Sequence, residues 1–223
     1  MVALTAITRA ILNFRDLEEK LGRRRTENPH FFPEWQMSLP ELSATETTGL
    51  NRLSQRYLTY LETNEVSEGT LNIILLAPFL DMLGLCDPPY RIRGETWVEV
   101  QTQIDTEGGK ITLEGRIDAL TVLDNFWLVV IEGKRSSFSV LRAIPQAIAY
   151  MSATQYHPIF GLVTNGYDYL FIKCAGSEFG LSHNFSLLSD ATGNLLRVAQ
   201  VLKHLVRLNF RTINNGKGLT PNG

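Results

Sequence analysis

The chain has 223 residues, of which 44% are hydrophobic, and its formal charge at pH 7 is −2. This length and apolar fraction predict a soluble globular domain with a substantial core. The near-neutral charge excludes a protein that coats nucleic acid through a broad basic surface, so any nucleic-acid contact must be local. No apolar run approaches the roughly 20 residues of a membrane span, and no secretory pattern opens the sequence. We therefore expect no membrane contact and a cytoplasmic location.

Cysteine and histidine residues show no pattern of a metal or redox site. Cys86 and Cys174 stand far apart without a CxxC pair, and the four histidines are scattered. The sequence therefore indicates neither a disulfide framework nor a zinc site. It also lacks a G-x-x-x-x-G-K-[ST] phosphate loop, so we expect no ATP-driven motor within it.

Helical periodicity dominates the first part of the chain. Apolar spacing predicts a helix over 1–22, then an irregular Pro- and Gly-rich connector, then a second helix around 50–61. Ser67 is the predicted N-cap of a third helix, which we expect Pro78 to kink and Gly84 to end.

From residue 67 onward the predicted order of elements is α-β-β-β-α-β-β-β-α. This order predicts an α/β fold with a mixed central sheet flanked by helices. We divide the chain into a helical extension with an irregular connector at 1–65, a core domain at 66–210 and a flexible tail at 211–223. The strands are predicted at 97–104, 110–122, 126–134, 159–166, 167–174 and 181–188, and the later helices at 139–155 and 189–208.

Three charged residues interrupt a stretch that otherwise reads as a buried β-hairpin. Asp118 lies on the first strand, whereas Glu132 and Lys134 lie on the second and share one face because strand side chains alternate. Residues 123–125 are typical of a tight connection. Since paired strands lie about 5 Å apart, we expect the two carboxylates to be close together.

The expected proximity of Asp118 and Glu132 points to a metal ion. Two close carboxylates repel each other, and burying them unpaired costs several kcal/mol. A divalent cation removes this conflict, and oxygen-only ligands suit Mg²⁺ or Mn²⁺ with positions left for water and phosphate. Lys134 adds a charge that can stabilise negative charge developing on phosphorus. An ExK triplet alone is common on exposed strands, but the apolar flank FWLVVI predicts burial, and the combination indicates phosphodiester hydrolysis.

The order and spacing of these residues resemble the PD-(D/E)xK nuclease signature. Asp118, thirteen further residues and the EGK triplet at 132–134 match it, on a hairpin between an earlier and a later helix. The family's usual proline is absent, because Ile117 precedes the aspartate. The resemblance covers residues 66–175 and implies a restriction-endonuclease-like fold with an α-β-β-β-α-β core.

Two further motifs extend the resemblance. The QAIAY stretch from Gln146 to Tyr150 is similar to the QxxxY element of type I restriction motor subunits and RecB-like nucleases. Its i,i+4 spacing places both side chains on one helical face, although Tyr150 is equally typical of a core aromatic. Pro145 either opens this helix or kinks it. Glu68 resembles a glutamate that faces the metal in type I restriction nuclease domains, although the helix dipole also favours a first-turn glutamate.

The resemblance implies a divalent-metal-dependent DNA endonuclease, part of or related to a restriction-modification system. The partners it implies are DNA, a motor or a methylase/specificity subunit, and a second copy of the chain in a homodimer. The alternative is a non-catalytic or partner-dependent DNA-binding or assembly subunit that keeps the fold. The implied catalytic residues are Asp118, Glu132, Lys134, Gln146 and Tyr150, and the implied ligands of Mg²⁺ or Mn²⁺ are Asp118, Glu132 and Glu68.

A run of three arginines, Arg23 to Arg25, has two interpretations. It is either a patch that contacts phosphates or a solvated face, and charge runs are more often the latter.

Overall fold

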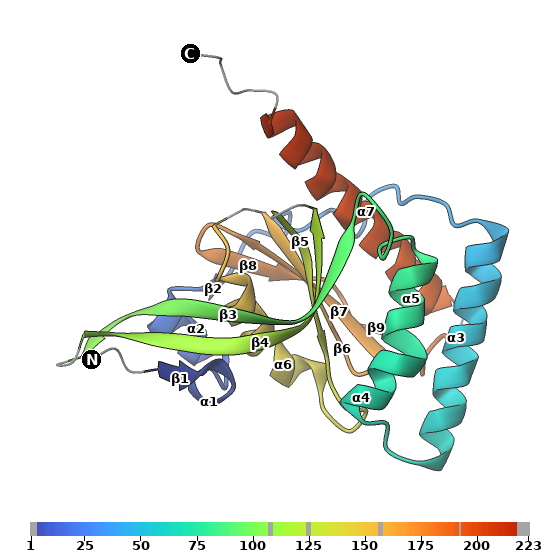
Figure 1. The fold of residues 1–223 in the computed structure, drawn as a ribbon, viewed down its shortest axis with the longest axis horizontal. Coiled ribbons are helices and arrows are strands. Elements are labelled where there is room, and N and C mark those ends of the chain that lie inside the picture. The colour runs from blue at the N-terminus through green and yellow to red at the C-terminus, as the bar shows by residue number, and fades with distance from the viewer. Residues whose placement is uncertain (1–3, 107–108, 124–125, 156–157, 192, 218–223) are drawn as a thin grey trace.

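The computed structural model describes residues 4–106, 109–123, 126–155, 158–191 and 193–217. Its centre is a nine-stranded sheet with helices on both faces (Figure 1). The predicted α/β class with a mixed central sheet is confirmed. The strand order is β1-β4-β5-β6-β7-β8-β2, with β3 also paired to β4 and β9 to β7. The strands are β1 (Leu4–Ala6), β2 (Arg24–Arg25), β3 (Arg91–Thr106), β4 (Gly109–Leu123), β5 (Phe126–Gly133), β6 (Ile159–Thr164), β7 (Asp168–Ala175), β8 (Glu178–Leu181) and β9 (Phe185–Ser186).

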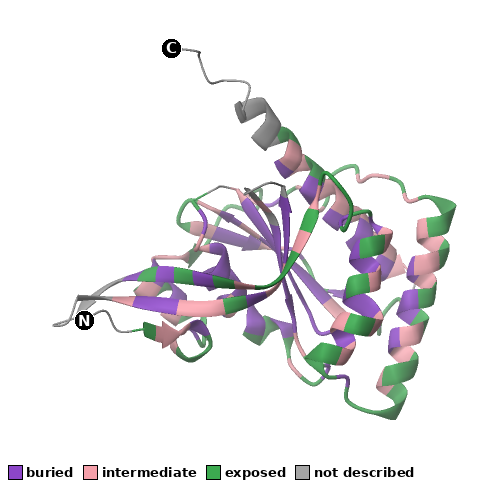
Figure 2. Ribbon diagram, in the orientation of Figure 1, coloured by how far each residue is buried: buried purple, intermediate pink, exposed green. Residues whose placement is uncertain are grey.

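Two hydrophobic layers enclose the sheet, and Figure 2 shows its central strands buried between them. Val129 and Ile131 of β5 pack into one layer, whereas Val130 between them packs into the other. Among the described helices, none combines the length and apolarity that crossing a bilayer requires. The first layer contains α3 (Ala44–Thr63), α4 (Glu68–Leu71), η1 (Asn72–Leu76), α5 (Ala77–Met82) and α7 (Gly193–Lys217), and the second contains α1 (Ile7–Ala10), α2 (Phe14–Leu21) and α6 (Val140–Met151).

The helix α6 connects the parallel strands β5 and β6. It begins after Ser139 and continues through Pro145, so Gln146 lies in its second turn rather than opening it. Because proline has no N–H, the carbonyl of Leu141 loses its helical donor. Leu141 is exposed, so water can replace that donor.

The helical segment after Ser67 is continuous but irregular. Ser67 caps it as predicted, since its hydroxyl accepts a backbone N–H of the first turn at 3.1 Å. The expected disturbance at Pro78 takes the form of the π-helical turn η1 just before it. Pro78 leaves the Ile74 carbonyl without its helical donor, and Arg56 of α3 supplies one at 3.2 Å. Gly84 ends the segment with a φ of 70°, as predicted.

The first 25 residues differ from the prediction. The described part contains β1, the single turn α1 and the helix α2, so the predicted continuous helix over 1–22 is wrong. Asn13 interrupts it, because its side chain accepts the Asp16 N–H at 3.0 Å while the Asp16 carboxylate accepts the Asn13 N–H, and this capping box starts a new helix. β1 instead pairs in parallel with β4, and β2 pairs with β8.

The last elements also differ in their bounds. The strand predicted at 181–188 divides into β8 and β9, which both pair with β7. Ser182 lies at the break, where its hydroxyl accepts the Phe171 N–H at 3.0 Å in place of a ladder carbonyl. α7 extends to Lys217, so the predicted tail is helical as far as it is described, and 218–223 lie outside the described residues. The division between 65 and 66 stays a prediction.

Candidate active site

The predicted site residues gather where the neighbours of β4 change. One edge of β4 pairs with β3, while the other pairs with β1 at Thr112–Glu114 and with β5 from Ala119 onward. Asp118 therefore lies at a fork between β1 and β5. Its Oδ2 accepts the backbone N–H of Gly133 at 2.8 Å, which confirms that Asp118 and the EGK triplet lie side by side.

Glu132 is the buried centre of the site, with only 1% of its surface exposed. Its Oε1 accepts two hydrogen bonds, from Lys134 Nζ at 2.6 Å and from Gln146 Nε2 at 3.0 Å. Its Oε2 is buried and has no hydrogen-bond partner among the described residues. A buried carboxylate oxygen without a partner is rare because its desolvation is not compensated.

Tyr150 belongs to both the site and the hydrophobic core. Its hydroxyl accepts a hydrogen bond from Gln146 Nε2 at 2.5 Å, so the QxxxY motif is connected to Glu132. Its ring is buried and lies so close to Gly115 that a Cβ at that position would be 2.6 Å from a ring carbon. The two interpretations of Tyr150 are therefore not exclusive.

Glu68 lies at the rim of this cluster. It stands in the first turn of α4, half of its side chain is exposed, and its carboxylate is 3.9 Å from Lys134 Nζ. Glu68 lines a groove of about 550 Å³ together with Glu65 and Arg135. Glu68 is therefore connected to the site by its ion pair with Lys134.

Burial shifts the pKa values of the charged groups. Burial, reinforced by the charge of Asp118, raises the pKa of Glu132 to about 8, although Lys134 opposes the shift. Burial also raises the pKa of Asp118, against the effects of Lys134 and the Gly133 N–H. Burial alone would lower the pKa of Lys134, but Glu132 and its acidic neighbours more than reverse this, so the pKa is raised. Burial and the charge of Glu132 raise the pKa of Tyr150 to about 12, which keeps its hydroxyl protonated.

The residues fit a divalent cation. Asp118 and Glu132 supply hard oxygen ligands, and the unpartnered Oε2 is one of them. Burial raises the pKa of both carboxyl groups, and a bound cation would favour their charged forms. In the described part of the chain, no three His, Cys, Asp or Glu side chains form a group that could hold a metal. One or two carboxylates completed by water and substrate phosphates are typical of Mg²⁺. The role of Glu68 as an additional ligand stays a prediction.

The raised pKa of Glu132 predicts a pH-dependent stability in the absence of metal. Between the ordinary value of 4.5 and the folded value of about 8, the folded chain holds more protons than the unfolded chain. We therefore expect the melting temperature to fall as the pH rises through this window. The Glu132→Gln variant should have a shallower slope, because glutamine does not titrate and Asp118 then remains as the raised carboxyl group of the pair. Melting curves of both proteins in EDTA would test this, and identical pH slopes would contradict it.

A residue beside the site that the sequence did not reveal is Glu95. It has a φ of 47°, unusual for a residue other than glycine, and it forms an ion pair with Arg116 at 3.0 Å. Its charge contributes to the raised pKa of Asp118, so it lies close to the acidic pair. Gly94 and Glu95 both lie before the strand predicted at 97–104, so no sequence pattern pointed to this residue.

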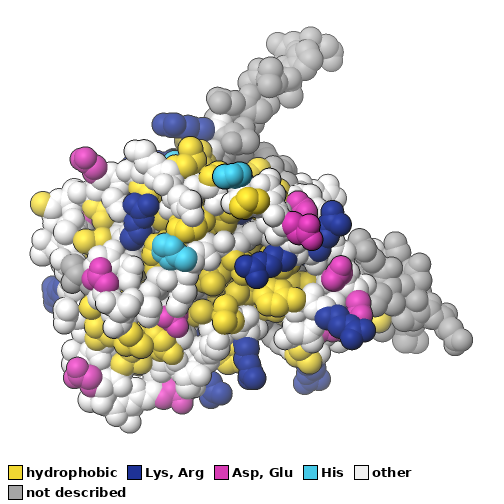
Figure 3. Space-filling model, turned by 180° about the vertical axis from the view of Figure 1, so that it is seen from behind, with side chains coloured by type: hydrophobic (Ala, Val, Ile, Leu, Met, Phe, Trp, Pro, Cys, Tyr) yellow, Lys and Arg dark blue, Asp and Glu magenta, His cyan; other side chains and the backbone are white. Residues whose placement is uncertain are grey.

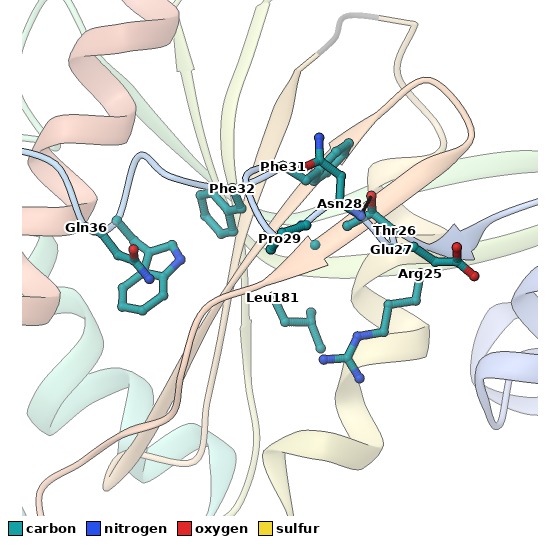
Figure 4. A pocket seen from close by; sticks show the side chains of 11 residues that line it. Arg25, Thr26, Glu27, Asn28, Pro29, Phe31, Phe32, Gln36 and Leu181 are labelled. Carbon is teal, nitrogen blue, oxygen red and sulfur yellow. Dashed lines mark hydrogen bonds between the residues drawn. The ribbon is translucent and has the colours of Figure 1, made fainter.

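The arginine run lies at the other end of the sheet. Arg23 donates to Ser152 Oγ at 3.0 Å and to the Gly176 carbonyl, while Arg24 is 3.7 Å from Glu178. Arg25 lines a cavity of about 200 Å³ that none of the predicted site residues lines (Figure 4). Two of the three arginines therefore have structural contacts, and a role in binding phosphates stays untested.

Comparison with known proteins finds a weak likeness to solved structures. The sequence matches no protein-family model and no curated protein. The chain is similar to a solved fragment described as an HsdR subunit of a type I restriction enzyme from Vibrio vulnificus YJ016, with a TM-score of 0.42 and 19% identity. The match covers 60% of this chain and 26% of that chain, so this chain spans about a quarter of its length. A likeness of this size identifies neither a family nor an activity.

Proposed function

We propose that this chain is a divalent-metal-dependent DNA endonuclease that hydrolyses phosphodiester bonds. The observation that carries the proposal is the buried Glu132 carboxylate beside Asp118 and Lys134, with one oxygen unpartnered in the described structure. Two carboxyl groups whose pKa values are raised by burial are costly to keep charged unless a cation joins them. Two carboxylates and a lysine also supply the charges that hydrolysis of a phosphodiester requires.

Each residue of the cluster has a distinct proposed role. Asp118 and Glu132 would hold Mg²⁺ or Mn²⁺, with Glu68 as an additional ligand, directly or through water. When bound, such an ion supplies Lewis-acid stabilisation to the phosphate oxygens of the substrate. Lys134 is held by its contact with Glu132, so its ammonium is fixed where it can stabilise charge developing on the phosphoryl group. Gln146 orients the Glu132 carboxylate and acts as a positioning residue.

The proposal is tested on the isolated chain with supercoiled plasmid. We expect nicking in Mg²⁺ or Mn²⁺ and none in EDTA, together with Mn²⁺ binding by calorimetry. Absence of both Mn²⁺ binding and nicking would reject the proposal.

Replacing Gln146 or Tyr150 should separate their site role from packing. Gln146→Ala should reduce nicking, because the Glu132 carboxylate loses the amide donor that orients it. Tyr150→Phe should also reduce nicking, because Gln146 then loses the hydroxyl that accepts its hydrogen bond. Stability should change little, since Gln146 is only half-buried and Tyr150→Phe keeps the ring. Nicking rates and thermal melts on the same samples would measure both effects, at about 2–4 °C per kcal/mol for a domain of this size. Gln200→Ala, which removes a glutamine contact to Pro40 outside the site, is the matched control. Large destabilisation with unchanged activity per folded molecule would remove both residues from the site.

A second candidate function is a subunit that turns over only with a partner, or not at all. It is favoured by the two-carboxylate ligand set, since the described residues include no third side chain grouped with it as a ligand. The resemblance of the QAIAY motif suggests a motor or methylase/specificity subunit of a restriction-modification system as that partner, with DNA as the shared substrate and a homodimer as a further option. Mn²⁺ binding without nicking by the isolated chain would favour this candidate.

A further inference from the structure

The β3–β4 ribbon extends from the sheet past the body of the molecule (Figure 1). One face of the ribbon is packed, since Val98, Val100 and Leu113 are buried in the layer that contains α2 and α6. The other face carries Trp97, of which 54% is exposed. The other two tryptophans, Trp35 and Trp127, are partly buried against the two hydrophobic layers. Trp97 is therefore the most exposed of the three tryptophans, and its indole is open to contact with a ligand.

Trp97 stands next to the candidate active site. It is the direct register partner of Arg116 on β4, and Arg116 precedes Asp118 by two residues, roughly 7 Å along the strand. Arg116 forms its ion pair with Glu95, whose charge acts on Asp118. The exposed indole of Trp97 therefore lies on the same short segment of the ribbon as Asp118.

The charges around Trp97 favour a base over a phosphate as its partner. One step farther from the site, Glu99 and Glu114 face each other across the two strands and would repel a phosphate backbone. Arg116 is the cation opposite Trp97, and its ion pair with Glu95 is exposed, so a phosphate can compete for it at low cost. On the face shown in Figure 3, Lys and Arg side chains are interspersed with acidic and hydrophobic ones, so that face carries no broad basic surface.

Resting on the nuclease function proposed above, we propose that Trp97 stacks on a base of the substrate strand beside the scissile phosphate. Arg116 contacts the adjoining phosphate. Beyond it, Glu99 and Glu114 repel the phosphate backbone, so the strand does not follow the ribbon outward. An indole can stack only on a base whose face is free. The preferred substrate is therefore DNA with an unpaired nucleotide at this position, as in a single strand, a flap or a frayed end, rather than a fully paired duplex.

The test measures binding without cleavage. Fluorescence anisotropy in EDTA compares labelled single-stranded DNA with a blunt duplex of the same sequence, on wild type, Trp97→Ala and Trp97→Phe. We expect Trp97→Ala to weaken single-strand binding by about 5- to 150-fold, while Trp97→Phe retains most of the affinity because an aromatic face remains. Duplex binding should change less than about twofold. Leu188→Ala, which removes an even more exposed apolar side chain outside the site, should change neither.

Intrinsic fluorescence provides a second reading that does not depend on the alanine variant folding. Single-stranded DNA should quench the tryptophan fluorescence of wild type more than that of Trp97→Phe. Both proteins contain Trp35 and Trp127, so the difference reports on Trp97 alone. Unchanged affinity of Trp97→Ala, equal losses on single strand and duplex, or equal quenching of wild type and Trp97→Phe would each overturn the inference.

Nicking in Mg²⁺ is measured in parallel. A wild type that binds single strands through Trp97 yet neither binds Mn²⁺ nor nicks would reject the nuclease proposal and leave the stacking contact standing.

Discussion

The Glu132→Gln variant is expected to lose Mn²⁺ affinity and to cut DNA at least about 10³-fold more slowly than wild type, since an ion that contributes several kcal/mol of charge stabilisation is no longer held. The fold should persist. The pKa of about 8 means that, without metal, this carboxyl is largely protonated near neutral pH, and glutamine imitates that neutral form. Calorimetry with Mn²⁺, plasmid nicking and a thermal melt on one preparation would measure all three effects.

The matched control for this variant is Glu34→Gln. Glu34 forms a similarly shielded ion pair with Lys173, at 2.5 Å, outside the candidate site. It should keep both metal affinity and nicking. Retention of Mn²⁺ affinity in Glu132→Gln would remove Glu132 from the ligand set, whatever happened to the rate.

Lys134→Ala is expected to slow cleavage by roughly 10²-fold or more while Mn²⁺ affinity changes little. A fixed charge near phosphorus acts mainly as negative charge develops in the transition state, so its loss lowers the rate and not the capture of the metal. Lys134 is only 12% exposed and its Nζ lies 2.6 Å from Glu132, which is the kind of fixed position that this role needs. Single-turnover rates at saturating Mn²⁺, with calorimetry in parallel, would measure the difference.

Lys173→Ala separates this effect from the general cost of breaking a shielded ion pair. It should alter the melting temperature without altering the rate per folded molecule. A loss of Mn²⁺ affinity in Lys134→Ala as large as the loss of rate would instead mark Lys134 as a residue that shapes the carboxylates.

Local signals in the sequence were enough to predict much of the candidate site. Strand alternation and the short hairpin connection placed Asp118 beside the EGK triplet, and the i,i+4 spacing placed Gln146 with Tyr150. The cap at Ser67 fixed where α4 begins and hence where Glu68 stands. Each of these depends on neighbours within a few residues or across one tight turn, which is the range over which sequence patterns are informative.

The remaining features depend on contacts between distant parts of the chain. Residues 4–6 carry a helical apolar pattern but become a strand because the free edge of β4 supplies backbone partners. The close approach of the Tyr150 ring to Gly115 depends on how α6 packs on β4. The left-handed backbone of Glu95 depends on the bend of the ribbon, which no residue type nearby specifies. Tertiary packing decides these positions, so periodicity alone did not predict them.

β1 and β2 both come from the first 25 residues, yet they lie at opposite ends of the strand order, where β1 pairs with β4 and β2 pairs with β8. A shortened chain that began at residue 66 would therefore leave β4 and β8 with rows of unpaired backbone N–H and C=O groups. Such open edges are templates for pairing with other chains, so aggregation would be the expected fate of that fragment. The N-terminal region thus gives the sheet two very short end strands, of 3 and 2 residues, which offer little backbone for pairing with another chain.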